Sequence, residues 1–131
     1  MTLLAPISVG ELFDKIGILE LKAEAIADPA RRENVRRELA ALDELRRREV
    51  PPCPELAPLC AELREVNRRL WQIEDDLRAC ERVGRFDAHF IELARAVYRE
   101  NDRRAALKRR INELTGSAIV EEKSYPLPAE P

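Results

Sequence analysis

A long apolar repeat in the second half of the chain restricts the fold more than any other feature of the sequence. Its members follow one another at alternating spacings of three and four residues: Leu56, Leu59, Leu63, Val66, Leu70, Ile73, Leu77 and Cys80. This heptad pattern places every member on one stripe of an α-helix, and it is typical of helices that pack lengthwise against another helix. The repeat, called the heptad seam below, predicts a helix over about 55–83 that ends at Gly84.

A second long helix is predicted directly after Gly84. Asp87 is a suitable N-cap residue and Gly116 a suitable stop, which bounds this helix at about 87–115. Apolar residues at helical spacing continue along it: Phe90, Leu93, Val97, Leu107, Ile111 and Leu114. Because the turn between the two helices is short, they should pack antiparallel as a long, coiled-coil-like hairpin.

The first half of the chain predicts two further helices. Ser8 and Glu11 have the spacing of a capping box, which indicates a helix over about 8–27. Asp28-Pro29 is a start signal for another helix over about 29–49, and Pro51, Pro52 and Pro54 follow it as a stiff connector. The predicted fold is therefore all-α, an antiparallel helical bundle of two αα-hairpins. We expect a single domain over 1–131 whose tail, 116–131, is extended or disordered.

Composition and charge narrow the class of protein. Charged residues make up 37% of the chain and there are only 4 glycines, as is usual for helical bundles. A net charge of −2 does not attract nucleic acid or an anionic membrane, and no apolar stretch approaches the roughly 20 residues that span a bilayer. No secretory signal is recognisable, and the 3 cysteines form no CxxC pair, so we expect reduced thiols and a cytoplasmic location.

Polar residues interrupt the apolar stripe of the fourth predicted helix. Glu100 and Arg104 stand where apolar residues are expected, with Asn101 close to the same face. A buried charge costs several kcal/mol unless it is paired, so the two would pair with each other or with Asp14 of the first helix. The interruption is a polar layer that fixes helix register, a part of the seam that opens to solvent, or an interhelical pocket for an anionic or hydroxylated ligand. The candidate ligand-binding residues of such a pocket are Asp14, Lys15, Glu100, Asn101, Arg103 and Arg104.

The first predicted helix is apolar on two faces. Opposite its main stripe, it carries a second patch made of Ile18, Leu21 and Ala25. A helix of this kind lies inside a bundle or between its own bundle and a partner. The patch is the candidate interface for self-association or for another protein.

Recognisable catalytic, metal-binding and cofactor-binding motifs are absent. The single histidine, His89, has no Glu-x-x-His or zinc-type context, and no glycine-rich phosphate loop occurs. The leading hypothesis is a non-catalytic interaction or adaptor module, and the alternative is a small enzyme or ligand-binding protein with an anion pocket. The basic run from Arg99 to Arg110 supports weak nucleic-acid binding as a third hypothesis, although no aromatic residues interleave it for base stacking.

Three segments resemble a small bacterial family of unknown function. They are the opening Ile7–Ile16, the run Val97–Arg104 continuing to Asn112, and the tail segment Ile119–Tyr125. Gly17 departs from the pattern, which would have a β-branched or polar residue there. The resemblance implies no activity; it implies an accessory role beside enzymes of bacterial surface-polysaccharide biosynthesis. The matching segments contain the unexplained polar residues, Asp14 and Lys15 as well as Glu100 to Arg104.

Overall fold

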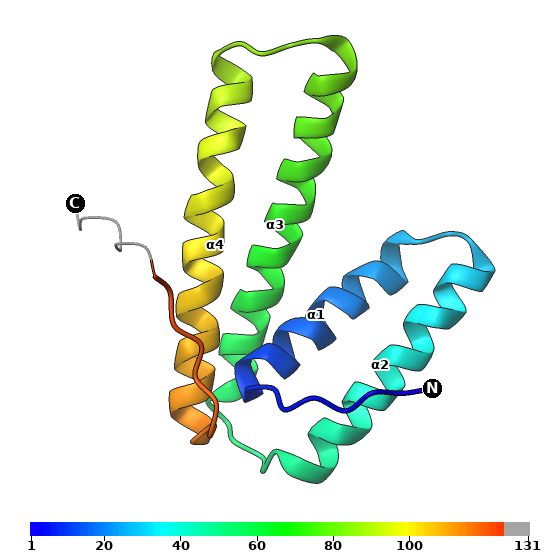
Figure 1. Ribbon diagram of the computed structural model, residues 1–131, viewed down its shortest axis with the longest axis vertical. Helices are drawn as coiled ribbons and strands as arrows, with labels where there is room; N and C mark the ends of the chain where they lie inside the picture. Colours follow the sequence, from blue (N-terminus) through cyan, green and yellow to red (C-terminus); the bar gives the residue numbers. More distant parts are fainter. Residues whose placement is uncertain (125–131) are drawn as a thin grey trace.

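The chain folds into helices joined by short connections (Figure 1). The structure, a computed structural model, describes residues 1–124, and within them it contains helices and no strands. The helices are α1 (Val9–Ala25), α2 (Pro29–Glu49), α3 (Leu56–Val83) and α4 (Ala88–Thr115). The all-α bundle predicted from the sequence is confirmed, and each observed helix end lies within two residues of the predicted one. The tail predicted to be extended or disordered lies partly outside the described residues; up to 124 it has no helix or strand.

The helices form two hairpins that diverge from the connector between α2 and α3 (Figure 1). The α3–α4 hairpin is the longer one, and α1 crosses one face of its lower half, contacting both helices. Among the helices, α2 packs against α1 alone, and none of its residues is buried. The α1 helix is therefore the central element, in contact with each of the other three.

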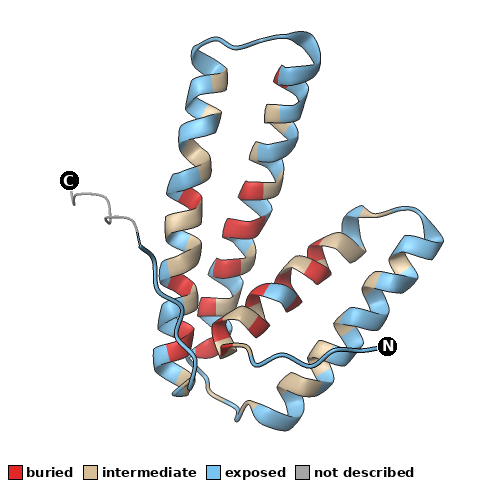
Figure 2. Ribbon diagram, viewed as in Figure 1, coloured by how far each residue is buried: buried red, intermediate tan, exposed pale blue. Residues whose placement is uncertain are grey.

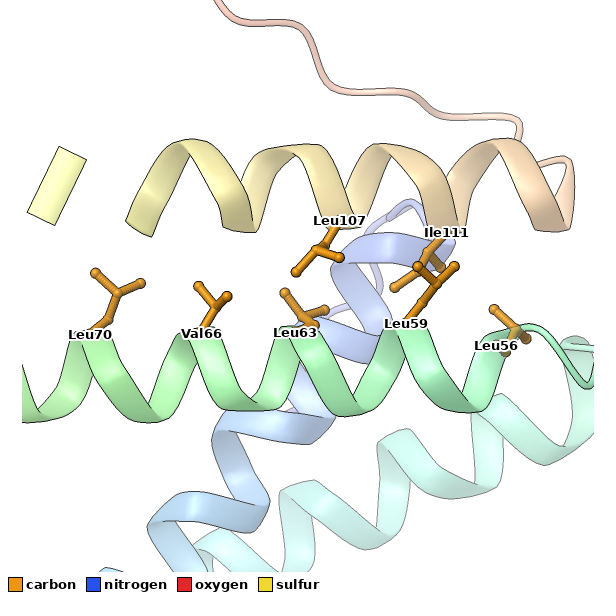
Figure 3. Close-up of a cluster of buried hydrophobic side chains, with 7 residues drawn as sticks. All are labelled: Leu56, Leu59, Leu63, Val66, Leu70, Leu107 and Ile111. Carbon is orange, nitrogen blue, oxygen red and sulfur yellow. The ribbon is translucent and has the colours of Figure 1, made fainter. Parts of the chain in front are cut away.

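The main apolar core uses only the first part of the heptad seam. It is made of Leu56, Leu59, Leu63, Val66 and Leu70 from α3 with Leu107 and Ile111 from α4 (Figure 3). Ile111 is 0% exposed and Leu63 1%. Burying each of these side chains stabilises the fold by roughly 1.5–3 kcal/mol. Val9 and Phe13 of α1 pack against the cluster, which therefore also holds α1 on the hairpin.

The heptad seam continues well beyond this core. Between Trp71 and Arg99, which includes the turn of the hairpin, Cys80 alone is buried (Figure 2). We call residues 71–83 of α3 and 88–99 of α4 the distal arm. Because α1 reaches only the base of the distal arm, and α2 does not reach it, the two helices of the arm have only each other to pack against over the rest of their length (Figure 1).

None of the helices within the described residues carries an apolar segment long enough to cross a bilayer.

Candidate functional site

Asp14 is a buried carboxylate at the point where α1 crosses the α3–α4 hairpin. It lies in the middle of α1 and is 0% exposed. Arg104 of α4 donates to both carboxylate oxygens, from Nε to Oδ1 at 3.0 Å and from Nη2 to Oδ2. Asn67 of α3 donates from Nδ2 to Oδ1 at 2.8 Å, and Lys108 Nζ lies 3.9 Å from Oδ2. These four residues, the Asp14 cluster, join three helices at one point.

The contacts of the Asp14 cluster offset the cost of burying a charge. A carboxylate without partners in the protein interior costs several kcal/mol, and this one is matched by a two-pronged guanidinium and an amide. The hydrogen bonds to Asp14 in turn raise the pKa of the Arg104 guanidinium. Both Arg104 nitrogens that face the carboxylate are used by it, and this contact ties α1 to α4. The rest of the Arg104 side chain is partly exposed and lines two surface grooves.

Glu100 belongs to a different group on the opposite side of the hairpin. It accepts hydrogen bonds from Arg69 Nε at 3.3 Å and from Arg103 Nη1 at 3.0 Å. The i,i+4 pair of Glu100 with Arg104 expected from the sequence is not formed, because Arg104 turns toward α1 and Glu100 toward α3. Both charges are nevertheless paired within the fold, as their seam positions require.

The predicted ligand-binding residues are therefore not gathered in one cavity. Asp14 and Arg104 meet, Glu100 and Arg103 meet elsewhere, and Lys15 is exposed, 3.8 Å from Glu11. The sixth, Asn101, makes no side-chain hydrogen bond within residues 1–124 and lines two surface grooves.

The predicted partner patch on α1 is only partly exposed. Leu21 is 6% exposed, so the expectation that it faces a partner is wrong for this residue. The reason is that α1 lies across α3, where Ile18, Leu21, Leu70 and Trp71 line a groove of about 310 Å³. Ile18 is half-buried and Ala25 exposed.

The first turn of α1 is held by three side chains, two of which were not predicted from the sequence. Its first backbone N–H groups donate to three acceptors: Val9 to Ser117 Oγ at 3.1 Å, Gly10 to Asn112 Oδ1 at 2.6 Å and Glu11 to Ser8 Oγ at 3.0 Å. Ser8 thus caps the helix as predicted, but the Glu11 side chain contacts Lys108 instead of completing a capping box. Only the cap at Ser8 is local in sequence, which is why the other two acceptors had no recognisable signal.

Replacing Ser117 with alanine is expected to lower the free energy of unfolding by about 1 kcal/mol, because the Val9 N–H at the start of α1 loses its acceptor. Urea denaturation followed by circular dichroism measures the change. Ser124→Ala is the control, because Ser124 is exposed in the same tail and its side chain makes no hydrogen bond within the described residues. The urea midpoint of this variant should equal that of the unmodified protein. Equal midpoints for both variants would contradict the assigned cap.

The basic run predicted as a weak nucleic-acid site is neutralised in the fold. Five of its six positive residues form ion pairs, and only Arg110 has none among the described residues: Arg99 pairs with Glu92, Arg103 with Glu100, Arg104 with Asp14, Lys108 with Glu11, and Arg109 with Glu113 and Glu122. Phosphate contacts need cations that are available to replace counterions. This arrangement gives little support to nucleic-acid binding.

Within residues 1–124, no three or more His, Cys, Asp or Glu side chains are grouped so that they could hold a metal ion.

The fold and the Asp14 cluster define an all-α protein whose two helical hairpins are locked together by buried ionic and amide contacts. A family model matches residues 3–131, and the chain belongs to that family, DUF6165, a family of unknown function. No curated protein and no solved structure matches the chain.

Proposed function

We propose that this protein is a non-catalytic interaction module that self-associates through its distal arm. The observation that carries the proposal is the exposure of apolar side chains along the arm and its turn: Val83 is 76% exposed, Phe86 57%, Ile91 56% and Tyr98 51%. A two-helix hairpin in water buries too little of its apolar surface, and further helices packed against it would cover these side chains.

The partner that best fits the distal arm is the distal arm of a second copy of the chain. Two hairpins packed face to face make a four-helix bundle, in which each hairpin supplies the layer that the other lacks. The arm extends about 20 Å along α3, which is long enough for several layers of side chains.

Charge supports pairing of α3 with the partner's α4. The α3 half of the arm has four acidic residues, Glu74, Asp75, Asp76 and Glu81, against Arg78 and Arg82. The α4 half has Arg95 and Arg99 against Glu92. Opposite net charges on the two helices favour the arrangement in which unlike helices meet across a twofold axis.

At its base the arm adjoins part of the partner patch predicted from the sequence. The groove between α1 and the base of the arm contains Ile18 and Trp71, together with charged residues of α3. Ile18 and Ala25 therefore remain in the proposed interface, as its edge.

Light scattering over a concentration series tests the proposal. The expected mass approaches twice the 15.0 kDa of one chain as concentration rises, and Ile91→Lys should shift the protein toward the monomer, because a charge would enter the apolar contact. Leu114→Lys is the matched control, since Leu114 is an exposed apolar residue near the other end of α4. A monomer at every concentration would exclude self-association, and equal effects of the two substitutions would place the contact elsewhere.

The cellular role of such a module is suggested only by the sequence resemblance to the bacterial family. We propose an accessory role beside enzymes of bacterial surface-polysaccharide biosynthesis, in the cytoplasm. Binding of the purified protein to a glycosyltransferase produced from the same bacterium would support this role, and its loss in Ile91→Lys would connect the role to the distal arm.

A further inference from the structure

A groove lies between α4 and the part of the tail that follows it. The tail turns back at Gly116 and runs along α4 (Figure 1). It is attached through Ser117 to Val9, through Glu121 Oε2 to Ser8 Oγ at 3.0 Å, and through Glu122 Oε2 to Arg109 Nη1 at 3.0 Å. Its residues 118–124 are all exposed, so the tail bridges over α4 rather than packing into it, and a space of about 630 Å³ remains. This volume is within the usual range for small-molecule sites.

The floor of this space, the strap groove, is one face of α4. Asn101, Ala105, Lys108 and Asn112 follow one another at helical spacing, with Asp102 beside them and Glu121 in the opposite wall. The small side chain of Ala105 leaves the middle of the floor open. The groove is separate from the distal arm, so what it binds does not depend on whether the arm self-associates.

Unused hydrogen-bonding groups line the strap groove. Asn112 is only 2% exposed, and while its Oδ1 accepts from Gly10, its Nδ2 has no partner within residues 1–124. The Asn101 amide and the Asp102 carboxylate likewise make no side-chain hydrogen bond or ion pair with the described residues. The Asn112 Nδ2 is not fully buried, and Asn112 lines the groove, so this nitrogen can donate to a molecule bound there.

The charges around the groove indicate what kind of molecule it could bind. Three of its cations already have carboxylate partners: Arg104 has Asp14, Lys108 has Glu11, and Arg109 has Glu113 and Glu122. The fourth, Lys123, is not free either. An additional anion would find no spare positive charge and would lie near Asp102 and Glu121. The unused groups are instead the Asn101 amide, which both donates and accepts, the Asn112 Nδ2, which donates, and the Asp102 carboxylate, which accepts. A hydroxyl group both donates and accepts, and it matches all three.

We propose that the strap groove binds a neutral, polyhydroxylated small molecule of mono- or disaccharide size. In this site Asn112 Nδ2 donates to a ligand oxygen, Asp102 accepts from a ligand hydroxyl, and Asn101 makes one contact of either kind. The tail covers the ligand on its outer side through Glu121.

Side-chain amide signals in the nitrogen–proton NMR spectrum of the full chain test this directly. The sequence has five side-chain amides, at Asn34, Asn67, Gln72, Asn101 and Asn112. Glucose, galactose, mannose and maltose are titrated separately. Each titration ends at the concentration where the signal of Gln72, a residue outside the groove, begins to move, because such a shift is unspecific. We expect at least one sugar to shift the Asn101 and Asn112 signals saturably while Asn34 and Gln72 stay in place.

Two variants and one anion complete the experiment. Asp102→Ala should weaken the binding about tenfold, the usual effect of losing a hydrogen bond to a charged group. Asp75→Ala should leave it unchanged, because Asp75 is an unpaired carboxylate on α3 outside this groove. Inorganic phosphate should cause no saturable shift. The proposal is overturned if none of the sugars moves the Asn101 and Asn112 signals, if phosphate moves them as strongly, or if Asp102→Ala binds as well as Asp75→Ala.

Discussion

Arg104→Ala is expected to lower the free energy of unfolding by about 3–5 kcal/mol, because it leaves the Asp14 carboxylate buried without its main counter-charge. With Arg104 in place, Asp14 is 0% exposed, so its charge is balanced by protein groups alone. Lys108 stays 3.9 Å away but is already engaged by Glu11, and Asn67 supplies a single amide hydrogen bond. For a protein of this size, such a loss would be a large fraction of the total stability.

The neighbouring arginine provides the control for this prediction. Arg103 is on the same helix and pairs with the carboxylate of Glu100. Its side chain is mostly exposed, and Arg69 would still pair with Glu100 after the substitution. Exposed ion pairs contribute about 0–1 kcal/mol, so Arg103→Ala should have a small effect. Chemical denaturation of both variants under identical conditions gives the comparison. Similar losses for the two arginines would show that the Asp14 cluster does not depend on its ion pair.

Gly10→Ala should also destabilise the protein, by roughly 2 kcal/mol or more. A Cβ atom at Gly10 would lie 2.5 Å from the backbone oxygen of Lys108 and 2.9 Å from Asn112 Oδ1. Since a backbone oxygen in a helix cannot turn aside, α1 would have to move away from α4. Overpacking costs about 1–3 kcal/mol, and the strained or broken hydrogen bond from Gly10 to Asn112 would add roughly another 1–3 kcal/mol.

A second glycine of α1 gives an effect of opposite sign. At Gly17 a Cβ atom would have Arg64 Cβ at 3.9 Å as its nearest neighbour, an ordinary contact. Alanine is favoured over glycine inside a helix by up to about 1 kcal/mol, so Gly17→Ala should raise the thermal midpoint while Gly10→Ala lowers it. Thermal unfolding followed by circular dichroism distinguishes the two. A Gly10→Ala variant as stable as Gly17→Ala would mean that α1 and α4 are not in close backbone contact.

The helices could be predicted from the sequence because their signals are local. Ser8, Asp28 and Asp87 cap helices where expected, and Gly84 and Gly116 end them in the left-handed conformation, at φ 68° and 66°. The site could be predicted only in part. That the charges at 100 and 104 need partners follows from their seam positions, but which partners they find depends on where α1 crosses the hairpin.

Long-range geometry also explains what the apolar repeat did not reveal. The heptad seam is uniform from Leu56 to Cys80, yet only its first part enters the main core, because α1 covers that part alone. Asn112 and Ser117 gave no signal as caps, since each serves a helix that begins more than 100 residues earlier. A repeat reports which face of a helix is apolar; it does not report how far the neighbouring helices extend along it.

The distances in sequence across the first turn of α1 have a consequence for biosynthesis. Asp14 and Arg104 are separated by 90 residues, and Gly10 and Asn112 by 102. On the ribosome the α1–α2 hairpin emerges before the arginine that pairs with Asp14, Arg104, has been translated. The side chains of Asn112 and Ser117, which accept from its first backbone N–H groups, are also still missing. The α3–α4 hairpin, which closes through a short turn, pays far less loop-closure entropy and is the natural template. The α1 helix can therefore dock in its final position only after α4 has been synthesised.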